Sequence, residues 1–174
     1  MVVLILGILA AMAMPQYFKA VERSRMTEAV TLLSNIASAQ QRKYLQINAY
    51  ATKYSGLDVT PAGATDNIYY TKGTNGNGFA ITLSSEKTYT AGKATATRAA
   101  NGTSTDSGLN YQYNLVRYYA SDLTTCNGTN TNGQALCADF CGVDAPQASC
   151  CSDGSTSACT APKTGNEPAT EAGK

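Results

Sequence analysis

The sequence predicts an α+β protein in which a long N-terminal helix packs on a small antiparallel β-sheet with a disulfide-rich C-terminal region. Three observations lead to this fold class. Residues 2–50 contain one proline, one glycine and mostly good helix formers. Short β-forming stretches separated by turn residues follow, and all six cysteines lie in the last third of the 174 residues. We expect a helix over 1–54 and a globular head over 55–174, of which 126–159 is cross-linked.

The chain begins with MVVLILGILAAMAM, an almost wholly apolar run that leads directly into Pro15. A membrane-spanning helix needs roughly 20 apolar residues, so this run alone is too short. A secretory signal peptide would carry positive charge before its apolar stretch, whereas here Lys19 and Arg23 follow it. The run is therefore neither a complete span nor an ordinary signal peptide.

Beyond Pro15 the apolar residues recur at the three- and four-residue spacing of an amphipathic helix. Such a stripe needs a partner, so the second half of the helix should pack on the head. The first half is apolar on every side and needs lipid or other helices around it. The amphipathic stripe comprises Met26, Ala29, Val30, Leu33, Ile36, Ala37, Tyr44 and Ile47.

Four stretches after Tyr54 have the composition of β-strands: NIYY, GFAITLS, KTYTAG and LNYQYNLVRYY. Asn-Gly pairs between the first two supply turn signals. We expect three or four antiparallel strands packed on the helix. The stretch AGKATATRAANGTSTDSG lacks large apolar side chains and predicts an exposed hairpin or loop, and the polar tail TAPKTGNEPATEAGK should follow the surface or fray.

The cysteines indicate disulfides formed in an oxidising compartment, because an even number clusters where few large apolar residues could build a core. A thiolate zinc site is the competing interpretation, but the chain has no CxxC pair and its C-x3-C and CC spacings suit zinc poorly. Six cysteines allow 15 pairings, and the sequence does not choose among them. They are Cys126, Cys137, Cys141, Cys150, Cys151 and Cys159.

Composition excludes several function classes. The chain has no histidine, which excludes Ser-His and Cys-His catalysis and histidine-ligated metals. Its net charge is +1 with no basic block, so no nucleic-acid site is expected. Only isolated carboxylates such as Glu86 and Asp106 remain, so we expect no enzyme, no metal and no cofactor. Asn101 and Asn127 head Asn-Gly-Thr sequons, which are candidate glycosylation sites and common by chance in a chain rich in Asn and Thr.

GILAAMAMPQY, followed by a charged helix and then QQRKYLQINAYAT, resembles the start of type IV pilins, in particular major pilins of the type IVa-like class, and of the related type II secretion pseudopilins. In that family the mature chain begins Phe-Thr-Leu-Ile-Glu, and prepilin peptidase cuts before the Phe and methylates it. Aligning Gly7 and Pro15 with the family's glycine and proline leaves about seven residues missing before Met1, which would bring the apolar segment to roughly 20. The family's docking glutamate would lie in that missing part. The resemblance covers Met1 to about Thr52.

The resemblance implies a structural subunit that polymerises into an extracellular filament for adhesion, motility or DNA uptake. Before assembly it would be a single-pass protein of the inner membrane. Its partners would be other copies of itself, the pilus assembly platform, a motor ATPase and prepilin peptidase. The residues expected in the membrane, and later in the filament core, are Val2, Val3, Leu4, Ile5, Leu6, Gly7, Ile8 and Leu9.

Gly7 and Pro15 mark the weakest part of the helix. Pro15 has no N–H to bond the Ala11 carbonyl, and glycine lowers helix stability by about 1 kcal/mol relative to alanine. One interpretation is a kinked membrane helix. The other, which the resemblance implies, is that this segment melts when subunits pack in a filament.

Two further family functions compete with the surface filament. A secretion pseudopilin would form a short periplasmic piston, and a minor pilin or adhesin would cap a filament. Major pseudopilins generally lack cysteines and carry an acidic calcium loop, whereas Asp139, Asp144 and Asp153 are too scattered for one. The resemblance therefore favours the surface filament.

The aromatic residues of the helix region and the charged residues after the apolar run also carry expectations. The aromatic residues Tyr17, Phe18, Tyr44, Tyr50 and Tyr54 are expected to serve packing rather than an electron path. The charged residues that follow the apolar run are expected to be solvated at the membrane interface, or to pair between subunits in a filament. They are Lys19, Glu22, Arg23 and Arg25.

Overall fold

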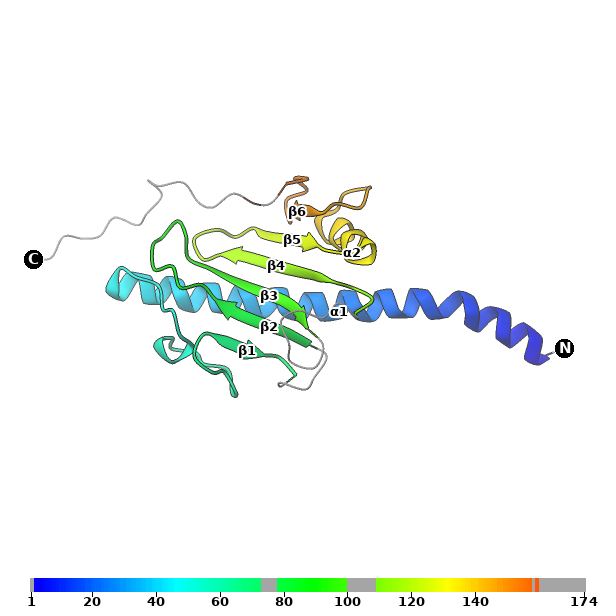
Figure 1. Cartoon of the computed structure of the whole chain (residues 1–174), viewed down its shortest axis with the longest axis horizontal. Coiled ribbons are helices and arrows are strands. Elements are labelled where there is room, and N and C mark those ends of the chain that lie inside the picture. Colours follow the sequence, from blue (N-terminus) through cyan, green and yellow to red (C-terminus); the bar gives the residue numbers. More distant parts are fainter. Residues whose placement is uncertain (1, 73–77, 100–108, 158, 160–174) are drawn as a thin grey trace, which may run out of the picture.

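The computed structural model describes residues 2–72, 78–99, 109–157 and 159, and it is built around one long helix, α1 (Val2–Ile47). The helix runs without interruption through Pro15 and ends where Asn48 adopts a left-handed backbone (φ 53°), a conformation that asparagine tolerates better than most residues. Its first part projects beyond the rest of the molecule, as Figure 1 shows.

Within these residues the sheet has six strands in the order β1-β2-β3-β4-β5-β6, and every neighbouring pair is antiparallel. Neighbours in the sheet are therefore consecutive in sequence, with β1 and β6 at the two edges. A second helix, α2 (Thr131–Cys141), separates the last two strands, and a 3-10 turn covers Tyr54–Gly56. The expected α+β class is confirmed. The strands are β1 (Ile68–Tyr70), β2 (Gly78–Leu83), β3 (Lys93–Ala99), β4 (Tyr113–Tyr118), β5 (Thr124–Gly128) and β6 (Ser149–Cys151).

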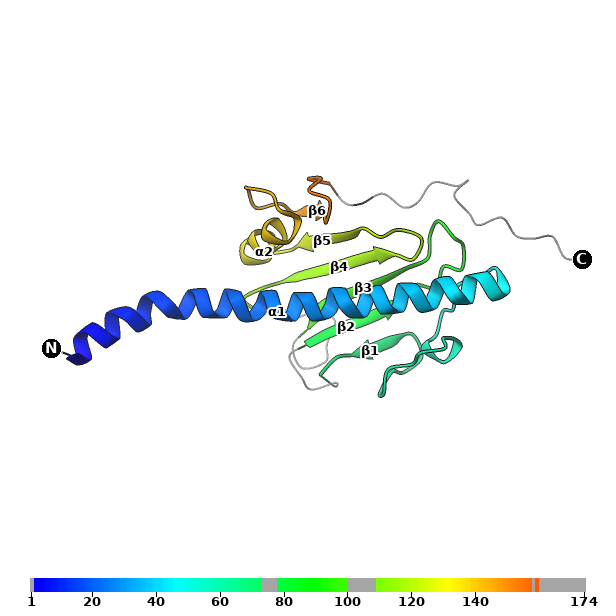
Figure 2. The same ribbon diagram turned by 180° about the vertical axis from the view of Figure 1, so that it is seen from behind.

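The core lies between one face of the sheet and the second half of α1, which crosses that face (Figure 2). The buried residues of α1 follow the helical spacing expected from the sequence, with Ala29 and Leu33 fully inaccessible. Ile47, which was expected in the same stripe, is exposed (57%) because it is the last residue of the helix, beyond the buried Tyr44. Across from the helix, β3 contributes Ala94 and Ala96, whose small side chains let the helix approach the sheet closely. The burial alternates along this strand, as it does in a sheet with one solvated face.

The sheet has more strands than the three or four expected, and two of the expected segments are wrong. Residues 93–99 were expected in an exposed hairpin or loop because they lack large apolar side chains, yet they form the central strand β3. The helix packs so close to this strand that only small side chains such as alanine fit between them. The stretch KTYTAG was expected to be a strand, but it forms turns that lead into β3. Its Gly92 lies against the rings of Tyr50 and Tyr119, where a β-carbon would not fit.

The cysteine-rich region contains α2, β5 and β6, none of which was predicted. Asn130 caps the start of α2 by accepting a hydrogen bond from the Gly133 amide (2.8 Å), and Gly142 ends the helix in the left-handed conformation (φ 71°). The predicted disulfides are confirmed: all six cysteines are paired and none is free. The pairs are Cys126–Cys137, Cys141–Cys150 and Cys151–Cys159.

Candidate functional site

The feature that sets this molecule apart is the projecting part of α1, residues 2–18, which we call the stalk. Every residue of the stalk is exposed, including Val3 (83%) and Leu9 (59%). An 18-residue window of α1 has a mean hydropathy of 1.7 and no part of it is buried in the molecule. By length and composition this helix could cross a membrane once, and a signal sequence near an N-terminus would have the same character. Its large apolar side chains are Val2, Val3, Leu4, Ile5, Leu6, Ile8, Leu9, Met12, Met14, Tyr17 and Phe18.

The residues predicted to form a membrane or filament core, Val2 to Leu9, all lie in the stalk and surround the helix on every side. Gly7 and Pro15 also lie there, within continuous helix. At Gly7 a β-carbon would meet nothing within 4 Å, so no contact inside the molecule requires a glycine there. The suggested melting concerns the assembled filament and stays a prediction.

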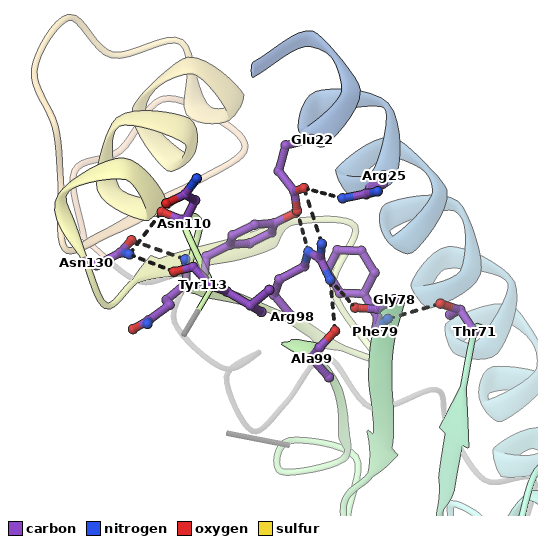
Figure 3. A network of polar contacts seen from close by, with 12 residues as sticks. Glu22, Arg25, Thr71, Gly78, Phe79, Arg98, Ala99, Asn110, Tyr113 and Asn130 are labelled. Atoms are coloured by element: carbon purple, nitrogen blue, oxygen red, sulfur yellow. Dashed lines mark hydrogen bonds and ion pairs between the residues drawn. The ribbon is translucent and has the colours of Figure 1, made fainter. Parts of the chain in front are cut away.

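Where the stalk meets the head, Glu22 turns into the core, and this overturns the expectation that it is solvated. It is 4% exposed, and the side chain of Arg98 on β3 is paired with it. The hydroxyl of Tyr113 on β4 donates to the same carboxylate (3.2 Å), and Arg25 donates to it from the rim (2.9 Å), as Figure 3 shows. A buried carboxylate is stable only with such partners, so α1 is held in one position against the sheet.

Arg98 completes its hydrogen bonding with the backbone of the sheet. Its Nη1 donates to the carbonyls of Gly78 and Ala99, both at 2.9 Å, and its guanidinium lies over the Phe79 ring. Burial, together with the neighbouring Glu22 carboxylate, raises the pKa of Tyr113, so this phenol remains a neutral donor. The network is therefore a structural anchor whose members are all satisfied.

A second charged contact fixes the same stretch of α1 to α2. Lys19 and Arg23 each place a nitrogen 2.6 Å from the Asp139 carboxylate. Partial burial opposes ionisation of Asp139, but the hydrogen bonds from Lys19 and Arg23 outweigh it and hold its pKa below the ordinary value. The four charged residues expected to be solvated or to pair between subunits thus find partners within one chain.

A cleft of about 490 Å³ opens at this junction. Tyr17 and Phe18 of the stalk form part of its rim, and Glu22, Arg25 and Arg98 lie at its polar side. Tyr17 (64%) and Phe18 (54%) are exposed, so they do not belong to the core of this chain, and the expectation that they serve packing stays a prediction.

At the opposite end of the head, Tyr44, Tyr50 and Tyr54 are buried packing residues, as expected. The rings of Tyr44 and Tyr50 lie 4.8 Å apart, and Tyr50 contacts Tyr119 at the same distance. This cluster closes the core beyond the end of α1.

The two sequons have different outcomes. Asn101 lies outside the described residues. Asn127 lies in β5, where its Nδ2, the atom that would carry a glycan, donates to Asn114 Oδ1 (2.8 Å), and its Oδ1 accepts from Ser149 (2.7 Å). Its side chain is therefore part of a polar ladder across three strands.

The structure adds groups that the sequence analysis missed. Arg98 and Tyr113 had no assigned role, although a single arginine among alternating Ala and Thr residues is a signal for a buried partner. Among the described residues no cluster of three or more Cys, Asp or Glu side chains could hold a metal ion.

Comparison with known proteins provides no relative. No protein family, no curated protein and no solved structure matches this chain.

Proposed function

We propose that this protein is a structural subunit of a filament of the type IV pilus kind, in which the stalks of many copies pack together and the heads lie outside. The observation that carries the proposal is a single helix with two different halves. Its second half is the core of the head, while its first half is apolar, wholly exposed and continuous with it. Such a surface needs cover, which a lipid bilayer or the stalks of other copies would supply.

The apolar area of the stalk supplies the driving force. At about 25 cal/mol per Å², covering seven large apolar side chains stabilises the packed state by on the order of 10 kcal/mol per subunit relative to water. Lipid covers the same surface equally well, so transfer from membrane to filament gains little from the hydrophobic effect. A motor would have to drive extraction, and the resemblance to pilins implies a cytoplasmic ATPase for that step.

The distribution of charge supports packing between stalks. From residue 2 to residue 18 the helix carries no charged side chain. The charged residues that follow, Lys19, Glu22, Arg23 and Arg25, are already paired within the subunit. Stalks could therefore pack side by side without burying an unpaired charge, and a repeated head-to-tail contact that does not close generates a helical filament.

Filaments sheared from the cell surface test the proposal. The parent chain should appear in the sheared fraction with an intact mass that accounts for three disulfides. Ile5→Lys should abolish filaments because it places a charge in the packed stalks. Leu45→Lys is the matched control: Leu45 lies in the same helix and is exposed (72%), but it belongs to the head, so filaments should persist.

Two outcomes would contradict the proposal. If the parent chain stays with the cell envelope and never enters the sheared fraction, the stalk is a membrane anchor or the protein forms a periplasmic pseudopilus. If Ile5→Lys and Leu45→Lys assemble equally well, the stalk does not form the filament core.

A further inference from the structure

Two of the three disulfides hold α2 in place. Cys137 joins α2 to Cys126 of β5, and Cys141, the last residue of α2, joins it to Cys150 of β6. The third disulfide, Cys151–Cys159, does not involve α2. The helix is therefore attached covalently to two neighbouring strands at the edge of the sheet.

Asp139 lies on α2 between these two attachment points and faces the first turn of α1 inside the head. Both cations that contact it, Lys19 and Arg23, are one helical turn apart. Lys19 is also the first residue of α1 after the stalk, so the contact sits where the stalk leaves the head. Figures 1 and 2 show α2 at this end of the sheet.

The contact lies beside a groove of about 290 Å³ at the junction of the two helices. Arg23, Met26 and Thr27 of α1 and Leu136, Asp139 and Phe140 of α2 line this groove. Met26 and Leu136 are themselves buried in the core, so the Asp139 carboxylate adds a charged contact to the apolar packing at this junction. Glu22 and Arg98 hold α1 to the sheet itself, on a neighbouring side of the helix.

We infer that α2 and its two disulfides form a clamp that fixes the direction in which the stalk leaves the head, acting on Lys19 and Arg23 through Asp139. The disulfides fix the position of α2, and α2 in turn fixes the position of Asp139. Through its contacts with Lys19 and Arg23, Asp139 then fixes the base of the stalk. The consequence of this clamp for assembly rests on the proposed function. Stalks that leave their heads in one direction can pack in one repeating arrangement.

Spin-label distances between stalk and head test the clamp in the full-length protein in detergent micelles. Ketone-bearing amino acids at positions 9 and 95 would carry the labels, so that no cysteine is modified. Asp139→Asn should broaden the distribution of distances between the two labels. Asp139→Glu, which keeps the carboxylate, should give a distribution narrower than that of Asp139→Asn. A second label pair at positions 45 and 95, both in the head, reports whether the head remains folded.

The disulfides are tested in the same way. Cys126→Ala/Cys137→Ala and Cys141→Ala/Cys150→Ala, made separately so that one attachment remains, should each broaden the distribution. Cys151→Ala/Cys159→Ala removes a cross-link of the same kind away from α2 and should leave it unchanged. In an Asp139→Asn background the α2 disulfide variants should add no further broadening, because the clamp is already open.

Three results would overturn the inference: an unchanged distribution in Asp139→Asn, equal broadening by all three disulfide removals, or additive broadening in the combined variants. If one α2 disulfide variant unfolds the head, the other and Asp139→Asn still decide the outcome. Filament formation is scored separately. A parent chain that never assembles contradicts the proposed function, while the label distances still accept or reject the clamp.

Discussion

Glu22 of α1 and Arg98 of β3, 76 positions apart in the sequence, form an ion pair inside the head, with their side chains 5% and 3% exposed. The pair lies just beyond the stalk, at the boundary between an apolar helix and a folded domain. Desolvating two charges is unfavourable, and here Tyr113, Arg25 and two backbone carbonyls compensate for it. The position of α1 on the sheet thus depends on this contact as well as on apolar packing.

Breaking the pair on one side should destabilise the head strongly. Glu22→Gln leaves the Arg98 guanidinium buried without a counter-charge, and we expect the free energy of unfolding to fall by about 3 kcal/mol. Glu22→Leu combined with Arg98→Met should recover most of this loss, since an apolar pair needs no compensation. Urea unfolding followed by circular dichroism measures both. Glu28→Gln, an exposed position on the same helix, is the control, and an equal loss there would argue against the buried pair.

Asp139 should make stability depend on pH in the acidic range. Its folded-state pKa lies below the ordinary value of 3.8, so its contribution is complete above that value and is lost as the pH falls through the folded pKa. Asp139→Asn should therefore be less stable than the parent near neutrality, by no more than about 1 kcal/mol because the contact is partly exposed, and the difference should shrink as the pH falls through the folded-state pKa.

Urea midpoints of the parent and Asp139→Asn over this pH range measure the effect. Asp122→Asn serves as the control: Asp122 also pairs with an arginine, Arg117 (3.3 Å), but its side chain is fully exposed, so the pair should contribute little to stability. A difference between parent and Asp139→Asn that is the same at every pH would show that the carboxylate acts by packing alone.

Gly92 should not tolerate a side chain. A β-carbon at this position would overlap the Tyr50 ring and crowd Tyr119, both of which are buried. Gly92→Ala should lower the free energy of unfolding by about 1–3 kcal/mol through overpacking. Gly7→Ala, where nothing lies within 4 Å, should cause no destabilisation in the same thermal or urea unfolding experiment. Similar behaviour of the two variants would contradict the packing at the tyrosine cluster.

Pro15 should make the stalk helix locally weak even though it is continuous. Because proline removes one helical hydrogen bond and crowds the preceding turn, a penalty of about 3 kcal/mol falls on this segment. Pro15→Ala should slow hydrogen exchange of the amides between Gly7 and residue 15 in micelles, measured by mass spectrometry. Met14→Ala, a neighbouring stalk substitution that keeps the proline, should leave exchange nearly unchanged. Equal exchange in Pro15→Ala and the parent would remove the basis for the predicted melting.

The sequence by itself determined the two halves of α1, the sites of β1, β2 and β4, and the presence of disulfides. Each of these follows from a local pattern: helical spacing from Met26 to Tyr44, β-forming residues bounded by turns, and cysteines gathered in a region that cannot build a core. Such patterns predict the structure correctly because they depend on residues that are close together in the sequence.

Only the tertiary structure decided which distant groups meet. In the sequence Ala94 and Ala96 have the character of loop residues, but in the structure they are buried beneath α1. Glu22 is expected to be solvated from the sequence, but in the structure it is buried and paired with Arg98 of the sheet. The contact of Asp139 with α1 likewise joins segments far apart in sequence. The disulfides join cysteines only 8 to 11 positions apart, but six cysteines so close together allow several pairings, and the fold of α2 against β5 and β6 selects one of them. The free energies of burial and of ion pairing depend on which groups pack together in the folded protein, so they cannot be predicted from the local spacing of residues in the sequence.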